Sequence, residues 1–239
     1  MNKLKEVWAK RDTETDFKNI IPLDLGLKEQ GTKRVINDKV LQVAAPRVNA
    51  PLTIDGDLSD WQGIPQVDFD YKKSVESGEL KAGDGFEPGF WLAWDDKYLY
   101  FAAKVKDKEL ITTKEKDQIW QDDCVEIFID PDLDGIEWNN KKDFQIGLSP
   151  SGPAKKPQVW CWFQGVSGEP DILVASKTEG TGGYIIEAAI PWKFLNMTPR
   201  KRDVIGISVA FHDKDSDREV KVNWCYLDGG KKLGRLSLE

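Results

Sequence analysis

The sequence predicts an all-β fold, an antiparallel β-sandwich of the jelly-roll type. From Leu41 onward, short runs in which apolar and polar residues alternate recur, and Gly, Pro, Asp and Asn separate them. No stretch keeps a helical period, although the polar segment 108–118 has room for one turn of helix. Many short strands separated by loop residues are typical of two packed antiparallel sheets.

Residues 1–38 differ from the rest in composition. They mix both signs of charge and contain one apolar patch, Ile20-Ile21-Pro22-Leu23. We expect them to be a linker or the tail of a preceding segment, and residues 39–239 to form the sandwich.

The predicted strands follow one another at short intervals. Trp94-Asp95-Asp96-Lys97-Tyr98 has the composition of a hairpin turn between two of them. The segment from Pro65 to Pro88, with Gly78, Gly83 and Gly85, predicts a mobile surface loop. In chain order the predicted strands are 40–44, 52–54, 67–71, 89–94, 98–105, 124–130, 144–148, 158–164, 172–176, 184–190, 205–212, 220–226 and 234–238.

The composition excludes several classes of partner. The net charge is −7 and the isoelectric point is about 5.0, which argues against nucleic acid or an anionic membrane. The three cysteines have no zinc spacing, and we expect buried free thiols. No apolar run is long enough to span a membrane. The first ten residues contain no secretion segment, so we expect a chain that stays inside the cell or belongs to a longer exported protein.

The chain contains ten tryptophans, more than one core normally needs. Some are therefore expected at a binding surface. Trp138 lies in a polar loop and is one exposed candidate. By their positions in predicted strands or motifs, Trp61, Trp94, Trp192 and Trp224 are expected in the core.

The predicted strand 124–130 offers a candidate sugar site. Alternation sends Val125, Ile127 and Ile129 to one face, and places Glu126 on the other. Trp120 comes just before this strand. An indole covers the C–H face of a sugar ring, and a carboxylate accepts hydrogen bonds from its hydroxyls. The alternative is that Trp120 closes one end of the sandwich and Glu126 is simply solvated.

Neighbouring strands extend this face. Alternation puts Gln145, together with Gly147 and Ser149, on the side of Glu126. On a later strand it puts His212 there, together with Ser208 and Ala210. His212 is either a sugar ligand or a hydrogen-bonded histidine at a strand end. Trp160 and Trp162, two residues apart, share one face and either stack on a sugar or line a second core face.

Two groups of aspartates invite a metal interpretation. Asp130, Asp132 and Asp134 precede Gly135 at the spacing of a calcium loop, but Lys141 stands at the twelfth position, where such loops carry Glu. A solvated acidic hairpin is the alternative. Asp107 and either Asp122 or Asp123 are further candidate ligands, whereas the Asp55, Asp57 and Asp60 group has the composition of a turn.

Five segments together resemble the carbohydrate-binding module family 9. They are 53–61 (TIDGDLSDW), 94–100 (WDDKYLY), 120–130 (WQDDCVEIFID), 183–192 (GYIIEAAIPW), and Ile205-Gly206 followed by His212-Asp213. The similarity covers about residues 45–239. It implies a β-sandwich that holds the end of a sugar chain, is appended to a polysaccharide-degrading enzyme, and often carries structural calcium. It also implies an extracellular or periplasmic location for the full-length protein.

The resemblance is incomplete at the sugar site. Trp120 and Glu126 match one of the two clamp tryptophans and the carboxylate of the best-understood branch. That branch has Arg and Asn where this chain has Gln145 and Gly147, and an amide where it has Ala210. The late loop that bears the second clamp tryptophan is missing, because 227–232 leads almost directly into the last strand.

These residues support a non-catalytic sugar-binding module and leave three alternatives. One is a scaffold or docking domain of a multidomain glycoside hydrolase that has lost its ligand. A second is a haem-binding sandwich, for which only His212 and Met197 are available beyond Met1. A third is a hydrolase that pairs Glu126 with Glu187 or Asp213.

Overall fold

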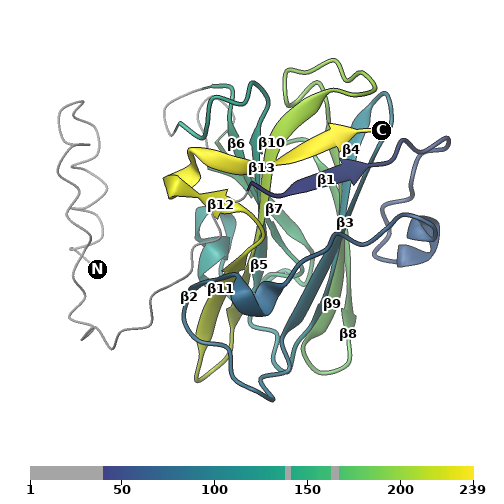
Figure 1. Ribbon diagram of the computed structural model, residues 1–239. Helices are drawn as coiled ribbons and strands as arrows, with labels where there is room; N and C mark the ends of the chain where they lie inside the picture. Colours follow the sequence, from purple (N-terminus) through teal and green to yellow (C-terminus); the bar gives the residue numbers. More distant parts are fainter. Residues whose placement is uncertain (1–39, 138–140, 163–166) are drawn as a thin grey trace. The chain divides into compact units, whose positions relative to one another are not determined.

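The computed structural model describes residues 40–137, 141–162 and 167–239, and Figure 1 shows two sheets packed face to face. The predicted β-sandwich is therefore confirmed. The predicted tail, residues 1–38, and Trp138 lie outside the described residues.

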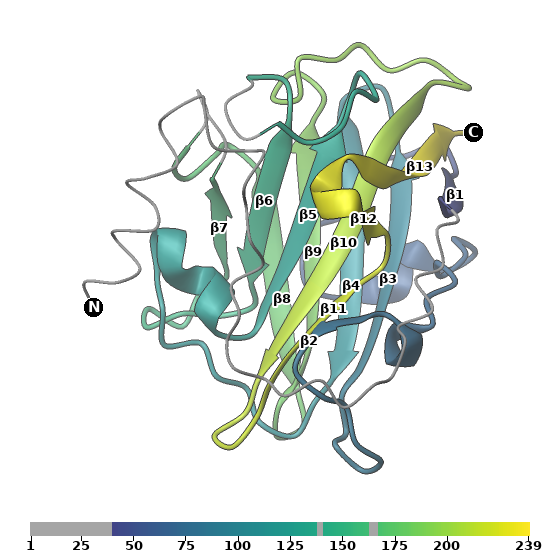
Figure 2. The same cartoon turned by 60° about the vertical axis from the view of Figure 1, so that its left-hand side comes forward.

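The larger sheet, sheet A, carries the strand that contains Glu126 at its centre. Its order is β1 (Gln42–Ala45), β13 (Lys232–Leu238), β10 (Val204–Lys214), β5 (Cys124–Asp130), β6 (Phe144–Ser149) and β7 (Gln158–Cys161). The far half of β10 pairs with β11 (Glu219–Asn223), β11 pairs with β2 (Val75–Ser77), and β13 pairs with the short β12 (Tyr226–Leu227). Figure 2 shows this sheet from its outer side, with β6, β5, β10 and β11 next to one another.

The smaller sheet, sheet B, has the order β3 (Glu87–Trp94), β4 (Tyr98–Lys106), β9 (Gly183–Pro191) and β8 (Leu173–Glu179). The predicted hairpin turn after Trp94 joins β3 to β4. The outer face of sheet B is covered by Trp61 and by partly buried side chains from the preceding segment, including Leu52 and Ile54.

The core lies between the sheets and follows the predicted alternation. Val125, Ile127 and Ile129 of β5 point inward, and Phe90 and Phe101 come from sheet B. Of the tryptophans expected in the core, Trp94, Trp192 and Trp224 belong to this cluster, and Trp61 is buried against the outer face of sheet B. The three cysteines are buried and form no disulfide, as predicted.

Two predicted strands are wrong. Residues 52–54 form no ladder because their apolar side chains pack on sheet B while the Thr53 amide donates to Asp60. Residues 67–71 bond to β3 only through the Val67 amide, which donates to the Phe90 carbonyl at 2.9 Å. The segment 65–88 is also not a free loop, since it contains β2 and a 3-10 turn, η4 (Tyr71–Lys73), and its Phe86 is buried in the core.

Three further 3-10 turns complete the described structure. These are η3 (Leu58–Trp61), η5 (Lys116–Gln121) and η6 (Asp228–Gly230). Asp55, Asp57 and Asp60, in the segment 53–61, act as turn residues, as expected. Asp57, for example, caps η3 by accepting from the Ser59 amide. None of the described helical segments is long and apolar enough to span a membrane.

Candidate functional site

The candidate site is the outer face of sheet A, the side that points away from the core. Glu126 on β5 pairs with Gly147 on β6 and with Ala210 on β10. On its other side, Gly147 pairs with Trp160 on β7. These four positions form one row across the sheet. The predicted sharing of a face is therefore confirmed for Glu126, Gly147 and Ala210, and of the two alternatives for Trp160 the structure places it on this outer face.

Glu126 is the buried centre of a polar network. It is only 2% exposed, so the alternative of a solvated carboxylate is wrong. Gln145 Nε2 donates to its Oε1 at 2.9 Å, while His212 Nε2 and Lys221 Nζ lie 2.9 and 3.3 Å from its Oε2. Burial raises the pKa of Glu126, but His212, Lys221 and Gln145 outweigh burial and hold this pKa at about 2.

The network continues onto β11 and β2, through residues that the sequence reasoning missed. Lys221 Nζ also lies 3.6 Å from Glu76, and Asn223 Nδ2 donates to Glu76 Oε2 at 3.2 Å. Asn223 in turn accepts from Ser208 Oγ at 2.6 Å. A signal for this was present: 219–223 alternates polar and valine residues, so Lys221 and Asn223 share one face.

Trp120 is held in the turn η5, which contacts β5, β6 and β7 and in Figure 2 is the teal turn beside β7. Its neighbour Ile119 is 1% exposed and lies over Gly147. Asp122 fixes the segment that leads into the turn by accepting from the Thr113 and Lys114 amides at 2.5 and 2.9 Å. The Trp120 residue itself is 37% exposed, so it does not close an end of the sandwich.

Trp160 and Trp162 are half-buried on this outer face and do not belong to the core between the sheets. The Trp162 ring lies directly over Gly147: a Cβ on that glycine would come within 2.2 Å of the ring. Trp162 Nε1 donates to the Asp117 carbonyl of η5 at 3.0 Å. The absence of a side chain at Gly147 therefore leaves room for the Trp162 ring, and Trp162 supports the turn that carries Trp120.

Two polar atoms on this face have no hydrogen-bond partner among the described residues. They are Gln145 Oε1, an acceptor, and Trp160 Nε1, a donor. Unpaired buried polar atoms are costly, and a ligand that pairs with them removes this cost.

Two hollows lie elsewhere on the described surface. One of about 230 Å³ adjoins η5 and β7 and is lined by residues that include Lys116, Gln158 and Val159. A wider one of about 660 Å³ lies near Tyr98, Trp192 and Met197. Neither includes Trp120 or Glu126 in its lining.

The structure separates the carboxylates of the hydrolase alternative. Glu187 lies on the outer face of sheet B, where it accepts from Trp61 Nε1 and the Gly56 amide, both at 2.6 Å. It is therefore on the other side of the sandwich from Glu126. Asp213 is fully buried and is engaged by Arg218. The two candidate axial ligands of the haem alternative are also engaged elsewhere: His212 bonds to Glu126, and Met197 packs against the core.

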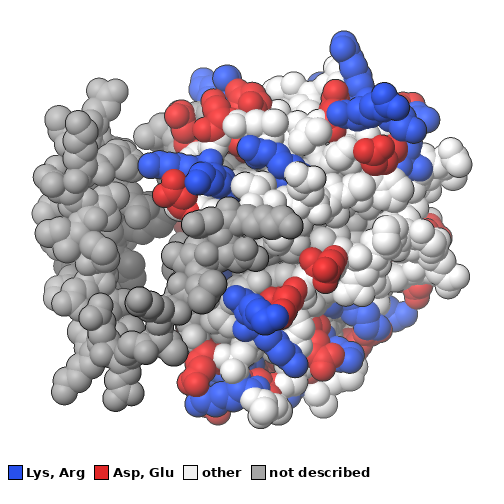
Figure 3. Space-filling model, viewed as in Figure 1, with Lys and Arg blue, Asp and Glu red and all other residues white. Residues whose placement is uncertain are grey.

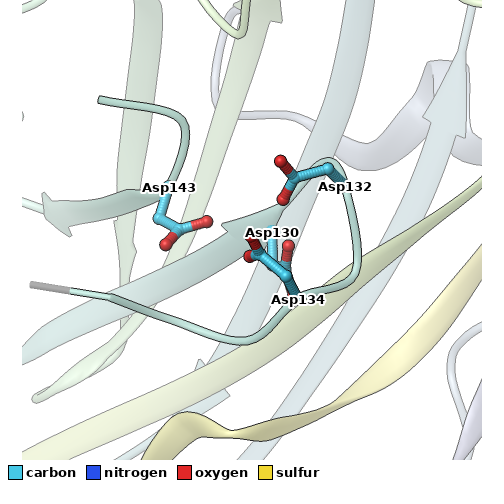
Figure 4. Close-up of side chains that lie close together, drawn as sticks. All are labelled: Asp130, Asp132, Asp134 and Asp143. Carbon is cyan, nitrogen blue, oxygen red and sulfur yellow. The ribbon is translucent and has the colours of Figure 1, made fainter. Parts of the chain in front are cut away.

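Asp130, Asp132 and Asp134 come together in the loop after β5, and Asp143, which precedes β6, joins them (Figure 4). One ligand oxygen from each lies within 4.8 Å of the others. Asp130 is buried, and its two oxygens accept from the Leu133 and Gly135 amides at 2.7 and 2.8 Å. It is therefore not a solvated hairpin residue.

Asp143 is the member that the calcium-loop spacing did not identify. It is completely buried, and its Oδ1 has no partner among the described residues. Burial, and after it the charges of Asp130, Asp134 and Asp132, raise its pKa to about 6, against the amide of Glu137, which donates to it. These four oxygens fit the all-oxygen coordination that calcium prefers.

A β-sandwich with a polar network on one outer face, and an exposed tryptophan in a turn that contacts the strands of that network, has the parts of a sugar-binding module. Lys, Arg, Asp and Glu side chains are interspersed over the described surface seen in Figure 3, with no single-sign field of the kind that binds nucleic acid. The class defined by fold and face is thus a carbohydrate-binding domain.

The sequence matches the family described as "Carbohydrate family 9 binding domain-like" over residues 54–231, and the chain belongs to this family. It is 30% identical over 174 residues to endo-1,4-beta-xylanase A of Thermotoga maritima, which covers 72% of this chain. It is 27% identical over 194 residues, 80% of the chain, to exoglucanase XynX of Acetivibrio thermocellus. The matches span only 15% and 16% of those two proteins.

Solved structures support the fold. Two structures of a family 9 carbohydrate-binding module from Caldicellulosiruptor kristjanssonii, in complex with cellotriose and with glucose, give TM-scores of 0.62 and 0.63 at 20% identity. Each covers 83% of this chain, and the matches span 93% and 95% of those chains.

Proposed function

We propose that this domain binds the end of an oligo- or polysaccharide on the outer face of sheet A, without catalysing its hydrolysis. The observation that carries the proposal is the exposed Trp120 in η5, a turn that contacts β5, the strand of Glu126, and its neighbours β6 and β10. A sugar ring stacked on Trp120 buries its C–H face, while its hydroxyls reach the polar groups of the same sheet.

Glu126 acts in this proposal by orienting its neighbours. Both of its oxygens are already engaged by Gln145, His212 and Lys221. Gln145 Oε1 and Trp160 Nε1 supply an acceptor and a donor for sugar hydroxyls. His212, whose side chain is 12% exposed, lies at the rim of the network. Trp162 contributes by fixing η5 rather than by clamping a second face of the sugar.

The ligand class follows from the relatives. The named relatives are xylanases and an exoglucanase, and the similar modules were solved with cellotriose and glucose. β-1,4-linked glucan and xylan fragments are therefore the sugars to test. One stacked ring and a few hydrogen bonds lead us to expect modest affinity.

The proposal also makes the chain one module of a polysaccharide-degrading enzyme, joined to a catalytic domain. Its support is that the curated relatives match it over about 15% of their length. Because polysaccharides are too large to cross a membrane, such a protein acts outside the cytoplasm, in an extracellular or periplasmic location.

Titration calorimetry of the chain with glucose, cellotriose and xylotriose tests the proposal. We expect saturable heat with at least one sugar, and a loss of about tenfold or more in affinity in Trp120→Ala. The matched control is Leu173→Ala, an apolar residue 54% exposed on sheet B. Absence of heat with every sugar, or equal loss in both variants, would favour the scaffold alternative, a docking domain without a ligand.

We also propose that the cluster Asp130, Asp132, Asp134 and Asp143 holds a structural calcium ion. Its support is the convergence of four oxygens and the unpartnered Asp143 Oδ1. Asp134→Asn tests it, because Asp134 is exposed and its removal breaks no backbone hydrogen bond among those described. We expect weaker calcium binding by calorimetry, and unchanged binding would contradict this proposal.

A further inference from the structure

The wider of the two hollows lies on the sheet B side of the sandwich. Its volume is about 660 Å³, which is within the usual range for small-molecule sites. One wall is the turn 95–97 between β3 and β4, and the other is the segment 192–199 that follows β9, both at the upper end of the sandwich in Figure 1. Between them, Tyr98 on β4 pairs with Pro191 on β9, and Tyr98 packs with the cluster on the outer face of sheet B.

Hydrogen bonds fix the two walls to each other. Trp192 Nε1 donates to the Asp95 carbonyl at 2.9 Å, and the Trp192 amide donates to the Lys97 carbonyl at 3.0 Å. The Asp95 carboxylate shapes the turn by accepting from the Lys97 and Tyr98 amides at 2.7 and 2.8 Å. The Met197 amide donates to the Trp192 carbonyl at 2.9 Å and so closes the second wall. The hollow is therefore formed before any ligand binds, which lowers the cost of binding.

The rim of the hollow carries unpaired positive charge. Lys97 and Lys193 line it, both are exposed, and neither has an ion-pair partner within the described part of the chain. The lining also contains one acid, Asp96, but Arg47 neutralises it at 2.5 Å. The second wall continues into 200–202, Arg-Lys-Arg, which are exposed and likewise without an ion-pair partner among the described residues. In a chain with a net charge of −7, this is a local excess of positive charge that attracts an anion.

The rest of the lining suits a sugar ring. Tyr98 is half-buried and presents part of an aromatic ring, and Met197 and Pro199 add apolar surface for C–H groups. The exposed side chains of Asn196 and Thr198 offer an amide and a hydroxyl, which can both donate to and accept from sugar hydroxyls. A lysine ammonium group pairs with a carboxylate. A ligand that uses all of these groups is a sugar that carries a carboxylate.

We propose that this hollow is a second carbohydrate site, which takes a uronic acid unit of an acidic polysaccharide with Lys97 and Lys193 around its carboxylate. The site lies on the sheet B side, whereas Glu126 lies on the outer face of sheet A, so it does not rest on the sugar binding proposed there. Because both lysines are exposed, the affinity is modest and falls as the salt concentration rises.

An NMR titration of the ¹⁵N-labelled chain with sodium glucuronate at low salt tests the site. We expect saturable shifts of the amides of 96–98 and 193–198, and no such shifts with glucose, which lacks the carboxylate. Lys193→Gln should weaken glucuronate binding about two- to fivefold, the usual contribution of one exposed charge. The matched control is Lys177→Gln, an exposed lysine of β8 that pairs with Asp57, and it should leave the affinity unchanged, as should Trp120→Ala.

Four results would each overturn the proposal. Absence of saturable shifts at these amides means that the hollow takes no uronate. Equal shifts with glucose mean that the carboxylate is not recognised, and equal shifts with the same concentration of inorganic phosphate mean an adventitious ion only. Loss of glucuronate binding in Trp120→Ala would assign the uronate to the outer face of sheet A instead. Failure of glucose, cellotriose and xylotriose to bind there would leave this second site untouched, so the two proposals fail separately.

Discussion

Replacing Glu126 by glutamine tests whether the network on the outer face of sheet A is held by charge. The introduced amide would have nearly the same shape as the carboxylate, but Lys221 would keep only Glu76, at 3.6 Å, as a counter-charge among the described residues. Lys221 is largely buried, with its side chain 21% exposed. Removing one partner of a buried ion pair leaves the other charge uncompensated, which costs more than the pair contributes.

The magnitude follows from the pKa of Glu126, which lies at about 2 against a usual value of 4.5. At about 1.4 kcal/mol per pH unit, this corresponds to about 3 kcal/mol of stability. For a domain of this size, that lowers the melting temperature by about 6–12 °C. Because the folded pKa is depressed, the contribution is present above about pH 4.5 and is lost as the pH falls toward 2.

The assay is urea unfolding, followed by tryptophan fluorescence, of the unchanged chain and Glu126→Gln between pH 6 and pH 3. We expect the free energy of unfolding of the variant to be lower by about 3 kcal/mol at pH 6, and this difference to become smaller toward pH 3. Glu87→Gln is the control, since its ion pair with Lys106 is exposed and should contribute nothing measurable. A gap at pH 6 below about 1 kcal/mol, the value of exposed pairs, would refute the reasoning, as would a gap that is independent of pH.

Two further substitutions test the packing of the sandwich. Gly147→Ala puts a methyl group within 2.2 Å of the Trp162 ring, so we expect a loss of about 1–3 kcal/mol in urea unfolding together with weaker sugar binding; unchanged stability would mean that Trp162 does not lie on Gly147. Trp61→Phe removes the donor to Glu187 Oε1 and should cost about 1–3 kcal/mol without affecting sugar affinity, because Glu187 is on the other sheet; a loss of sugar affinity would show that the two outer faces are coupled.

Period-two alternation was enough to predict the fold and one face of the site. Val125, Ile127 and Ile129 have no alternative place but the core, so Glu126 had to point outward. The same rule correctly aligned Gly147 and Ala210 with it, whereas it left open which face Trp160 takes. It failed at 52–54 and 67–71, where apolar side chains pack without a ladder because alternation cannot distinguish a paired strand from an extended segment.

The sequence did not predict how Glu126 is satisfied. Local pattern suggested an acid open to a sugar or to solvent, whereas Lys221 reaches it from a strand 95 residues away in the chain (221 − 126). Glu76, on a third strand, in turn contacts Lys221. The aspartate cluster after β5 shows the same limit. Spacing brought together Asp130, Asp132 and Asp134, but Asp143 joins them only because β5 and β6 pair.

The central claim is that a sugar is held on the outer face of sheet A, with Trp120 beneath its ring. A crystal of the chain soaked with cellotriose tests this most directly. We expect one ring stacked on the Trp120 indole, with a hydroxyl within hydrogen-bond distance of Gln145 or His212. A sugar ordered elsewhere on the protein, or an empty outer face at saturating cellotriose and xylotriose, would contradict the account.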